Sequence, residues 1–342
     1  MRRIIFLLVS LLVSAVFLWL ALRGVPLADV WDSIQQANVL WIGVSFGSIT
    51  IGLWTRSVRW RGLLDDKISP MQAFHIVNIT FLVNQLPFRA GEIARSLLAR
   101  RAGVPVMTAA TSILVERLLD TLLVVIFLAV ALSRVPQVPD AASQVTVLFG
   151  IAAVVVFIVL LFFARRPHIA HNILTWLEDR IPVMQRLPFS RLLTHIVEGL
   201  QPLTNWHRFA HAVGWTLISW LFSFVTLYSL ILALGIDDVD RVLTSVLGVT
   251  LASFSIAIPV SVAAIGPFEG ALRVAGEAVN MSSELALSLG FLLHGMTVIG
   301  YAIWGIIGLL NQGVSFSETL KFGQQQSALQ EEATISPTAD AN

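Results

Sequence analysis

Three charged residues at helical spacing, Arg89, Glu92 and Arg95, interrupt an otherwise apolar stretch of the sequence. Further along, Glu116 and Asp120 lie four residues apart, so their carboxylates share one face of a predicted helix. A charge in hydrocarbon costs at least about 2.5–3.5 kcal/mol, so these groups must pair with one another or face water. Arginine also binds phosphate through two parallel hydrogen bonds. The spacing therefore predicts either a site for an anionic or zwitterionic lipid headgroup, or a purely structural network of ion pairs.

The headgroup interpretation gives each residue of the first group a role. Arg89 and Arg95 would bind phosphate. Glu92, Glu116 and Asp120 would hold these arginines or meet a positively charged part of the headgroup. Asn84 lies on the approach to Pro87, where it could donate to a ligand or simply satisfy backbone groups that the proline frees.

A second charged group follows a later proline. Glu269, Arg273 and Glu277 repeat at a spacing of four residues after Pro267. Because opposite charges at this spacing pair along a helix, a structural role is favoured for the group. Glu269 remains a candidate binding residue because it lies closest to the proline.

The composition predicts an all-α, polytopic membrane protein. The chain has 342 residues, of which 56% are hydrophobic and 13% charged, with a mean hydropathy of +0.81. An ordinary soluble domain has roughly 25% charged residues. The absence of cysteine excludes disulfides and thiolate chemistry. The spacing of the histidines does not indicate a metal site, and no arrangement of residues indicates a catalytic nucleophile. We therefore expect that the protein is not an enzyme and has no cofactor and no nucleic-acid partner.

The apolar runs predict about six full spans and two re-entrant broken helices. The full spans are expected at 4–22, 39–58, 112–133, 145–164, 210–235 and 285–310. The broken helices are expected at 71–88 and 243–266, and the residues predicted to break them are Pro87, Gly91, Pro259, Gly266 and Pro267. Broken helices at membrane depth are tolerated where protein or a watery space satisfies the freed backbone groups.

The positive charges predict the orientation. Most Lys and Arg residues near span ends collect on the side of the N-terminus, which is therefore expected to be cytoplasmic in a cell (inner) membrane. Residues 1–315 form the predicted membrane domain, and 316–342 a polar, disordered tail whose side is left open. Within the domain, 165–208 is expected to be a cytoplasmic amphipathic segment that lies on headgroups or packs on the ends of the spans.

Two short segments resemble each other across the chain. LPFRAGE (86–92) is echoed by IGPFEGA (265–271), and in the predicted topology the two breaks enter from opposite sides. This pattern is typical of inverted repeats in transporters, although a match of this length also arises by chance.

Four segments resemble the transmembrane, flippase-like domain of the lysylphosphatidylglycerol synthase family. They are WTRSVRWRGLL (54–64), LPFRAGEIARSLLARRAG (86–103), SILVERLLD (112–120) and IPVSVAAIGPFEGAL (258–272), within a resemblance that spans about 1–315. It implies an integral membrane protein that moves a phospholipid or another lipid-linked molecule between leaflets. The family signature falls here on Pro87, Arg89, Gly91, Glu92, Arg95, Glu116, Arg117, Asp120, Pro259, Gly266 and Glu269.

Two departures from the family pattern affect what we expect. The family often has Pro-Gly-Gly where this chain has Val262, Ala263 and Ala264, so the second break should be less flexible. The sequence also has no soluble aminoacyl-transferase segment, so lysyl transfer is not expected. The alternative to lipid translocation is a non-transporting membrane partner of a separate lipid synthase or glycosyltransferase.

Overall fold

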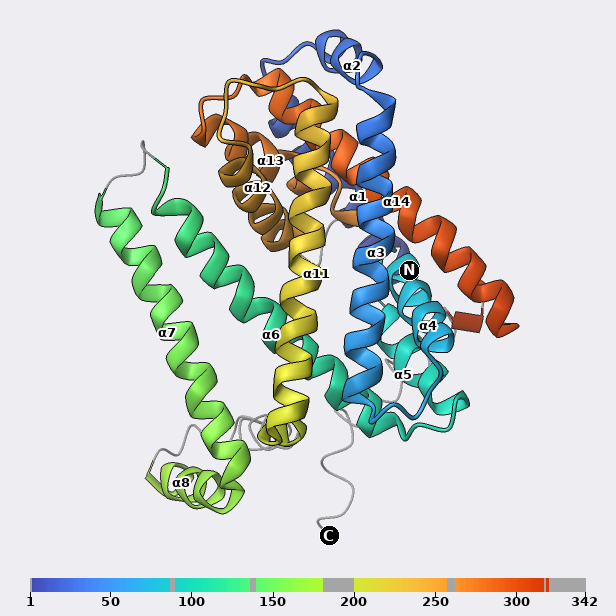
Figure 1. The fold of residues 1–342 in the computed structure, drawn as a ribbon, viewed down its shortest axis with the longest axis vertical. Helices are drawn as coiled ribbons and strands as arrows, with labels where there is room; N and C mark the ends of the chain where they lie inside the picture. Colours follow the sequence, from blue (N-terminus) through green and yellow to red (C-terminus); the bar gives the residue numbers. More distant parts are fainter. Residues whose placement is uncertain are drawn as a thin grey trace.

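The computed structural model describes residues 2–86, 90–135, 140–180, 200–256, 262–316 and 318–319, and every regular element in these ranges is a helix (Figure 1). The predicted breakers Pro87 and Pro259, Arg89, and nearly all of the 316–342 tail lie outside the described residues. The all-helical prediction is confirmed for the described part of the chain.

The same order of helix lengths occurs twice along the chain. A long helix, two short ones and a second long one form the first run: α3 (Val39–Leu63), α4 (Pro70–Val83), α5 (Gly91–Arg101) and α6 (Val106–Leu132). The second run is α11 (Trp206–Ala233), α12 (Arg241–Ile256), α13 (Pro267–Ala278) and α14 (Ser283–Gln312). Both predicted breaks fall between the two short helices of a run.

The remaining helices precede the first run, connect the two runs or, in one case, lie within the second run between α12 and α13. They are α1 (Arg2–Leu22), α2 (Leu27–Gln35), α7 (Asp140–Arg165), α8 (Pro167–Arg180) and the short 3-10 helices η1 (Gln201–Thr204) and η2 (Val262–Ala264). The predicted amphipathic segment 165–208 contains α8, where Ile173 and Trp176 are exposed, and 181–199 lies outside the described residues.

Polar side chains define where several of the long helices begin. Asn38 accepts a hydrogen bond from the Leu40 amide at the start of α3, and Asn205 caps α11 in the same way. Ser282 caps α14, which ends at Gly313 in the left-handed conformation, with φ +60°. Caps of this type satisfy amide groups that have no partner within the helix.

By length and apolarity, three of the described helices could cross a membrane, namely α3, α11 and α14. A fourth follows if Val9–Leu22 and Leu27–Gln35, bent by 82° relative to each other, count as one span. The spans predicted at 112–133 and 145–164 also fall on helices, α6 and α7. The first half of α6 carries three charged residues, Glu116, Arg117 and Asp120.

The two runs pack against each other in reciprocal pairs, and α3 lies along α11 at the centre (Figure 1). At one end the amide of Asn38 donates to the Ala233 carbonyl at 2.8 Å, and at the other Gly62 lies directly against His211. The start of α3 therefore meets the end of α11, so the two helices are antiparallel. Helix α4 packs on α14 of the other run, and α12 packs on α6.

Glycine allows α14 to approach α4 closely. A Cβ atom on Gly305 would lie 2.5 Å from the Leu82 Cβ, and one on Gly308 would lie 2.9 Å from the His75 carbonyl oxygen. Small residues of this kind are typical of helix contacts within membranes.

The second break contains two alanines in the left-handed region. Ala263 has φ 50° and ψ 19°, and Ala264 has φ 63°. This conformation brings the Cβ of an L-residue close to the following carbonyl oxygen and costs roughly 1–2 kcal/mol per residue. These are positions where the resembled family often has glycine, and that the break is stiffer with alanine stays a prediction.

Replacing Ala263 and Ala264 together by glycine should stabilise the protein. The relief of backbone strain exceeds the entropy cost of the two glycines, so the expected gain is about 1–2 kcal/mol in total. The measurement is the thermal unfolding midpoint in detergent. Ala110→Gly in α6 is the control and should lower the stability by about 1 kcal/mol, because its backbone is helical. A double variant that is no more stable than the wild type would contradict the strain.

A candidate site of arginines and carboxylates

Glu116 of α6 lies between two arginines from different helices. Its Oε1 accepts from Arg59 Nε of α3 at 3.1 Å, and its Oε2 accepts from Arg95 Nη1 of α5 at 2.6 Å. All three side chains are at most 5% exposed. The sequence predicted that Arg95 and Glu116 belong to one network without pairing them individually, and Arg59 was not among the predicted site residues.

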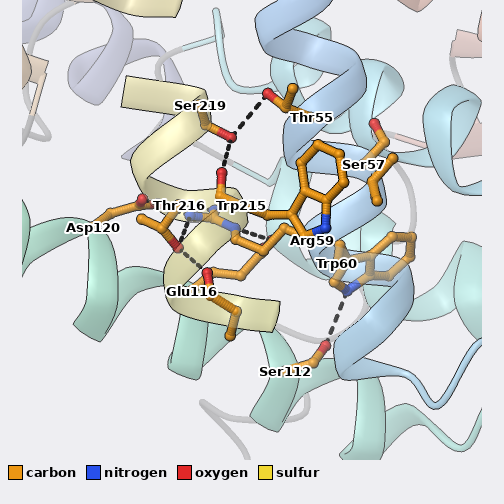
Figure 2. Close-up of polar contacts among 12 residues, drawn as sticks. Thr55, Ser57, Arg59, Trp60, Ser112, Glu116, Asp120, Trp215, Thr216 and Ser219 are labelled. Carbon is orange, nitrogen blue, oxygen red and sulfur yellow. Dashed lines mark hydrogen bonds and ion pairs between the residues drawn. The ribbon is translucent and has the colours of Figure 1, made fainter. Parts of the chain in front are cut away.

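Arg59 also binds Asp120 through both ends of its guanidinium. Nη1 donates to Oδ1 at 2.7 Å and Nη2 to Oδ2 at 3.1 Å, and Nη1 donates further to the Thr216 hydroxyl at 3.2 Å (Figure 2). Trp220 Nε1 donates to the same Asp120 Oδ1 at 3.3 Å. Helix α11 thus completes a network that α3, α5 and α6 begin.

Arg95 is the least satisfied member of this network. Its guanidinium lies over the Trp60 ring, 4.1 Å from the ring centroid, and the indole Nε1 of Trp60 donates to the Ser112 hydroxyl at 2.9 Å. Nε and Nη2 of Arg95 are buried and have no hydrogen-bond partner among the described residues. An unsatisfied buried donor costs about 1–3 kcal/mol, and more when it is charged. These two donors can bind an anion.

The network carries more positive than negative charge. Arg56, one turn before Arg59 on α3, donates from Nη2 to the Ser223 hydroxyl at 2.9 Å. Arg56, Arg59 and Arg95 thus stand beside two carboxylates, Glu116 and Asp120. We call these five residues the arginine cluster. Its excess of one positive charge favours a bound anion, because uncompensated charge is expensive in a low-dielectric environment.

Glu92 and Arg117 do not belong to the buried part of the site. They pair with each other at 2.8 Å, Arg117 Nε donating to Glu92 Oε1, and their side chains are 43% and 47% exposed. Of the three carboxylates predicted to hold the arginines or meet a positively charged part of the headgroup, Glu116 pairs with Arg95, whereas Glu92 pairs with Arg117. An exposed pair of this kind adds little stability.

Asn84 connects the two sides of the first break. Its Oδ1 accepts from the amide of Gly91, the first residue of α5, at 2.9 Å. Gly91 is required there, because a Cβ atom would overlap the Thr80 carbonyl and the Asn84 side chain. Of the two roles predicted for Asn84, the structure shows the one that satisfies the backbone.

Glu269 lies at the second break, apart from the arginine cluster. Its Oε2 accepts from the Gly266 amide at 2.7 Å, and its Oε1 is 2.6 Å from His294 Nδ1. Arg273 pairs with Glu277 at 2.7 Å. The predicted self-pairing of the three charges along α13 is thus correct for its second half only.

Sequence reasoning missed Arg56, Arg59, Thr216, Trp220 and His294. Arg56 and Arg59 were interpreted as positive charges at the end of a span and as part of a segment that resembles the family, but not as site residues, although their spacing of three residues places them on one helix face. Serine, threonine and tryptophan in an apolar helix carry no comparable signal. His294 stands alone in an apolar run, and that isolation was the available signal.

Comparison with known proteins identifies the family. The model of the lysylphosphatidylglycerol synthase TM region matches residues 7–305, which include both breaks and both helix runs except the last part of α14. No curated protein and no solved structure gives a match. With its apolar helices and a family match over most of its length, the chain is a multi-pass membrane protein that belongs to the lysylphosphatidylglycerol synthase transmembrane-region family.

Proposed function

We propose that this protein moves a phospholipid or another lipid-linked anion between the two leaflets, with the headgroup phosphate bound at the arginine cluster. The family supports a role connected with membrane lipids. The proposal depends on one observation: Nε and Nη2 of Arg95, on α5, are buried without a hydrogen-bond partner among the described residues. A phosphate oxygen accepts such donors well, and arginine matches its geometry.

The rest of the arginine cluster would orient Arg95. Glu116 fixes Nη1 of Arg95, and the Trp60 ring fixes the plane of its guanidinium. Both unsatisfied donors are therefore presented in one fixed geometry, which reduces the entropy lost when an anion binds. Arg89 lies outside the described residues and is proposed as a second phosphate ligand because it precedes α5 directly.

The arrangement of the helix runs supports movement between leaflets. We propose that the two runs form an inverted repeat, since α3 and α11 occupy the same place in each run and lie antiparallel. In transporters built this way, broken helices of the two repeats approach from opposite sides. The two breaks would then be re-entrant, with the N-terminus cytoplasmic in a cell inner membrane, as the positive charges indicate.

The test is lipid movement in liposomes. Purified protein is reconstituted into phosphatidylethanolamine–phosphatidylglycerol vesicles that contain a trace of fluorescent phosphatidylglycerol, and dithionite reports how much probe changes leaflet. Wild-type protein should accelerate this exchange, and Arg95→Lys should slow it by about tenfold or more. Lysine keeps the charge beside Glu116 but lacks the second and third guanidinium nitrogens, and a charge-assisted hydrogen bond contributes about 1.5–3 kcal/mol.

Arg117→Lys is the matched control, because Arg117 belongs to an exposed pair. It should retain the wild-type rate within about a factor of two, as expected for the loss of well under 1 kcal/mol. Equal rates for wild type, Arg95→Lys and protein-free vesicles would overturn the proposal. Exchange that appears only after a second polypeptide is added would favour the role of a membrane partner.

A further inference from the structure

A buried carboxylate–imidazole pair lies at the second break, far along the chain from the arginine cluster. Glu269 is 2% exposed and His294 8% exposed, and their Oε1 and Nδ1 atoms are 2.6 Å apart. The other carboxylate oxygen accepts from the Gly266 amide at 2.7 Å. The network of the arginine cluster uses neither residue.

The hydrogen bond of the second ring nitrogen of His294 determines how many protons the Glu269–His294 pair holds. Nε2 is 2.9 Å from the Ala263 carbonyl oxygen, which can only accept, so Nε2 must carry a proton. Nδ1 then either donates to the Glu269 carboxylate or accepts from its carboxylic acid form. Both arrangements contain one proton more than a carboxylate beside a neutral imidazole. The observed contacts are therefore all satisfied only when the pair has bound that proton.

The surroundings favour the state in which the pair has bound this proton, which we call the loaded state. The Phe268 ring lies 4.6 Å from the His294 ring, centroid to centroid, and an aromatic face stabilises an imidazolium. Phe268 belongs to a buried apolar cluster that also contains Leu272, Leu289 and Leu293, from the same two helices as the pair. A buried carboxylate without a charged or protonated partner is expensive, so loss of the proton must weaken one of the two contacts of His294.

The contacts of Glu269 and His294 stabilise strained backbone in the turn formed by residues 262–266. Ala263 is in the left-handed region, and Gly266 has φ +93°. His294, on α14, connects Ala263 on one side of the turn with Glu269 on the other. The same turn contacts α1, because the Val262 amide donates to the Ser14 hydroxyl at 3.0 Å. Loss of the contact between His294 and Ala263 would release the turn from α14.

Other charged and titratable groups lie on α13 and on the helices that pack against it and against α14. Arg273, one turn further along α13, pairs with Glu277 and donates to the carbonyl oxygens of Ala21 and Arg23. On α1, α2, α4, α12 and α14 these groups include Arg23 after α1, Asp29 and Asp32 on α2, His75 on α4, Arg241 at the start of α12, where it pairs with Asp237, and Glu284 and Tyr301 on α14.

We propose that Glu269 and His294 form a proton-binding site that controls the second break: with the proton bound the turn is fixed to α14, and its release frees the turn. The control of lipid movement by this site rests on the proposed function, whereas proton binding itself does not. The first run has arginines beside its break and the second has a proton-binding pair, so the two breaks would carry different ligands.

Glu269→Gln is the informative variant because it can keep every contact. The amide oxygen accepts from the Gly266 amide, the amide nitrogen donates to His294 Nδ1, and Nε2–H still donates to Ala263. The variant is thus a neutral copy of the loaded state that needs no extra proton, and it should fold. Glu277→Gln on the same helix is the matched control, since Glu277 is 44% exposed and pairs with Arg273.

The first readout is the accessibility of the turn, measured without any lipid movement. The chain has no cysteine, so Ile265→Cys, at a position 38% exposed, gives a single reactive thiol. Its labelling rate by a methanethiosulfonate reagent is measured with Glu269 intact and again with Glu269→Gln added, and taking the ratio cancels the ionisation of the thiol itself. The ratio of the first rate to the second should rise roughly threefold to tenfold from about pH 5.5 to about pH 8.5, because a rising pH favours loss of the proton that fixes the turn when Glu269 is present, whereas the Glu269→Gln variant needs no such proton.

The same variants are then measured in the liposome assay with fluorescent phosphatidylglycerol. Wild type and Glu277→Gln should move the probe faster as the pH rises, and Glu269→Gln should be slow and independent of pH. A constant labelling ratio would overturn the proton site even if lipid movement is seen. A rising ratio in a protein that moves no lipid would support the proton site and reject the proposed function.

Discussion

Glu116→Leu is expected to lower the free energy of unfolding by about 3–5 kcal/mol, because it leaves two buried arginines without their shared carboxylate. Arg59 would keep Asp120, but Arg95 would lose its only ion pair among the described residues. In detergent, this change should appear as loss of the monodisperse peak in size-exclusion chromatography after mild heating.

Two further variants give the prediction its controls. Glu92→Leu removes the carboxylate of an exposed pair and should cost less than about 1 kcal/mol. Adding Arg95→Met to Glu116→Leu removes the stranded charge, so the double variant should be more stable than Glu116→Leu alone. Equal losses for Glu92→Leu and Glu116→Leu would mean that Glu116 is not buried in an ion-pair network.

Gly266→Ala should destabilise the protein by roughly 2–5 kcal/mol, the sum of a left-handed backbone cost and a steric clash. Gly266 has φ +93°, and a Cβ atom would lie 2.5 Å from the Leu18 amide nitrogen and 2.7 Å from the Ser14 carbonyl oxygen. Both neighbours are backbone atoms of α1, which cannot move aside as a flexible side chain can.

The control for this clash is Gly214→Ala in α11. Nothing lies within 4 Å of a Cβ atom at Gly214, and alanine is the better helix former by up to about 1 kcal/mol. The two variants should therefore shift the thermal unfolding midpoint in opposite directions. A Gly266→Ala protein as stable as the wild type would show that α1 does not lie against the second break.

The sequence predicted the helices and the breaks because both have local causes. Apolar runs of sufficient length form helices in a membrane, and Pro267 with Gly266 marks the start of α13. The spacing of Glu116 and Asp120 predicted that their carboxylates share one helix face, and in the structure both accept hydrogen bonds from Arg59. The spacing of residues in the sequence thus predicts which side chains share one face of a helix.

The spacing does not predict which side chains of other helices contact this face. Arg59 lies 57 residues before Glu116, and nothing local distinguished it from the neighbouring cationic residues of its segment. Glu92 and Arg95 share a helix face, yet one reaches an exposed arginine and the other a buried carboxylate. Glu269 reached a histidine on the next helix rather than Arg273 one turn away. Each choice depends on how helices pack, which is a long-range property.

The contacts that α11 makes with the arginine cluster have a consequence for biosynthesis. Thr216 lies 157 residues after Arg59, and Trp220 lies 100 residues after Asp120. When the ribosome has finished α6, the guanidinium of Arg59 and the carboxylate of Asp120 still lack these donors and acceptors. The newly made first half must therefore remain at the insertion machinery, or tolerate incompletely solvated ions, until α11 enters the bilayer beside α3.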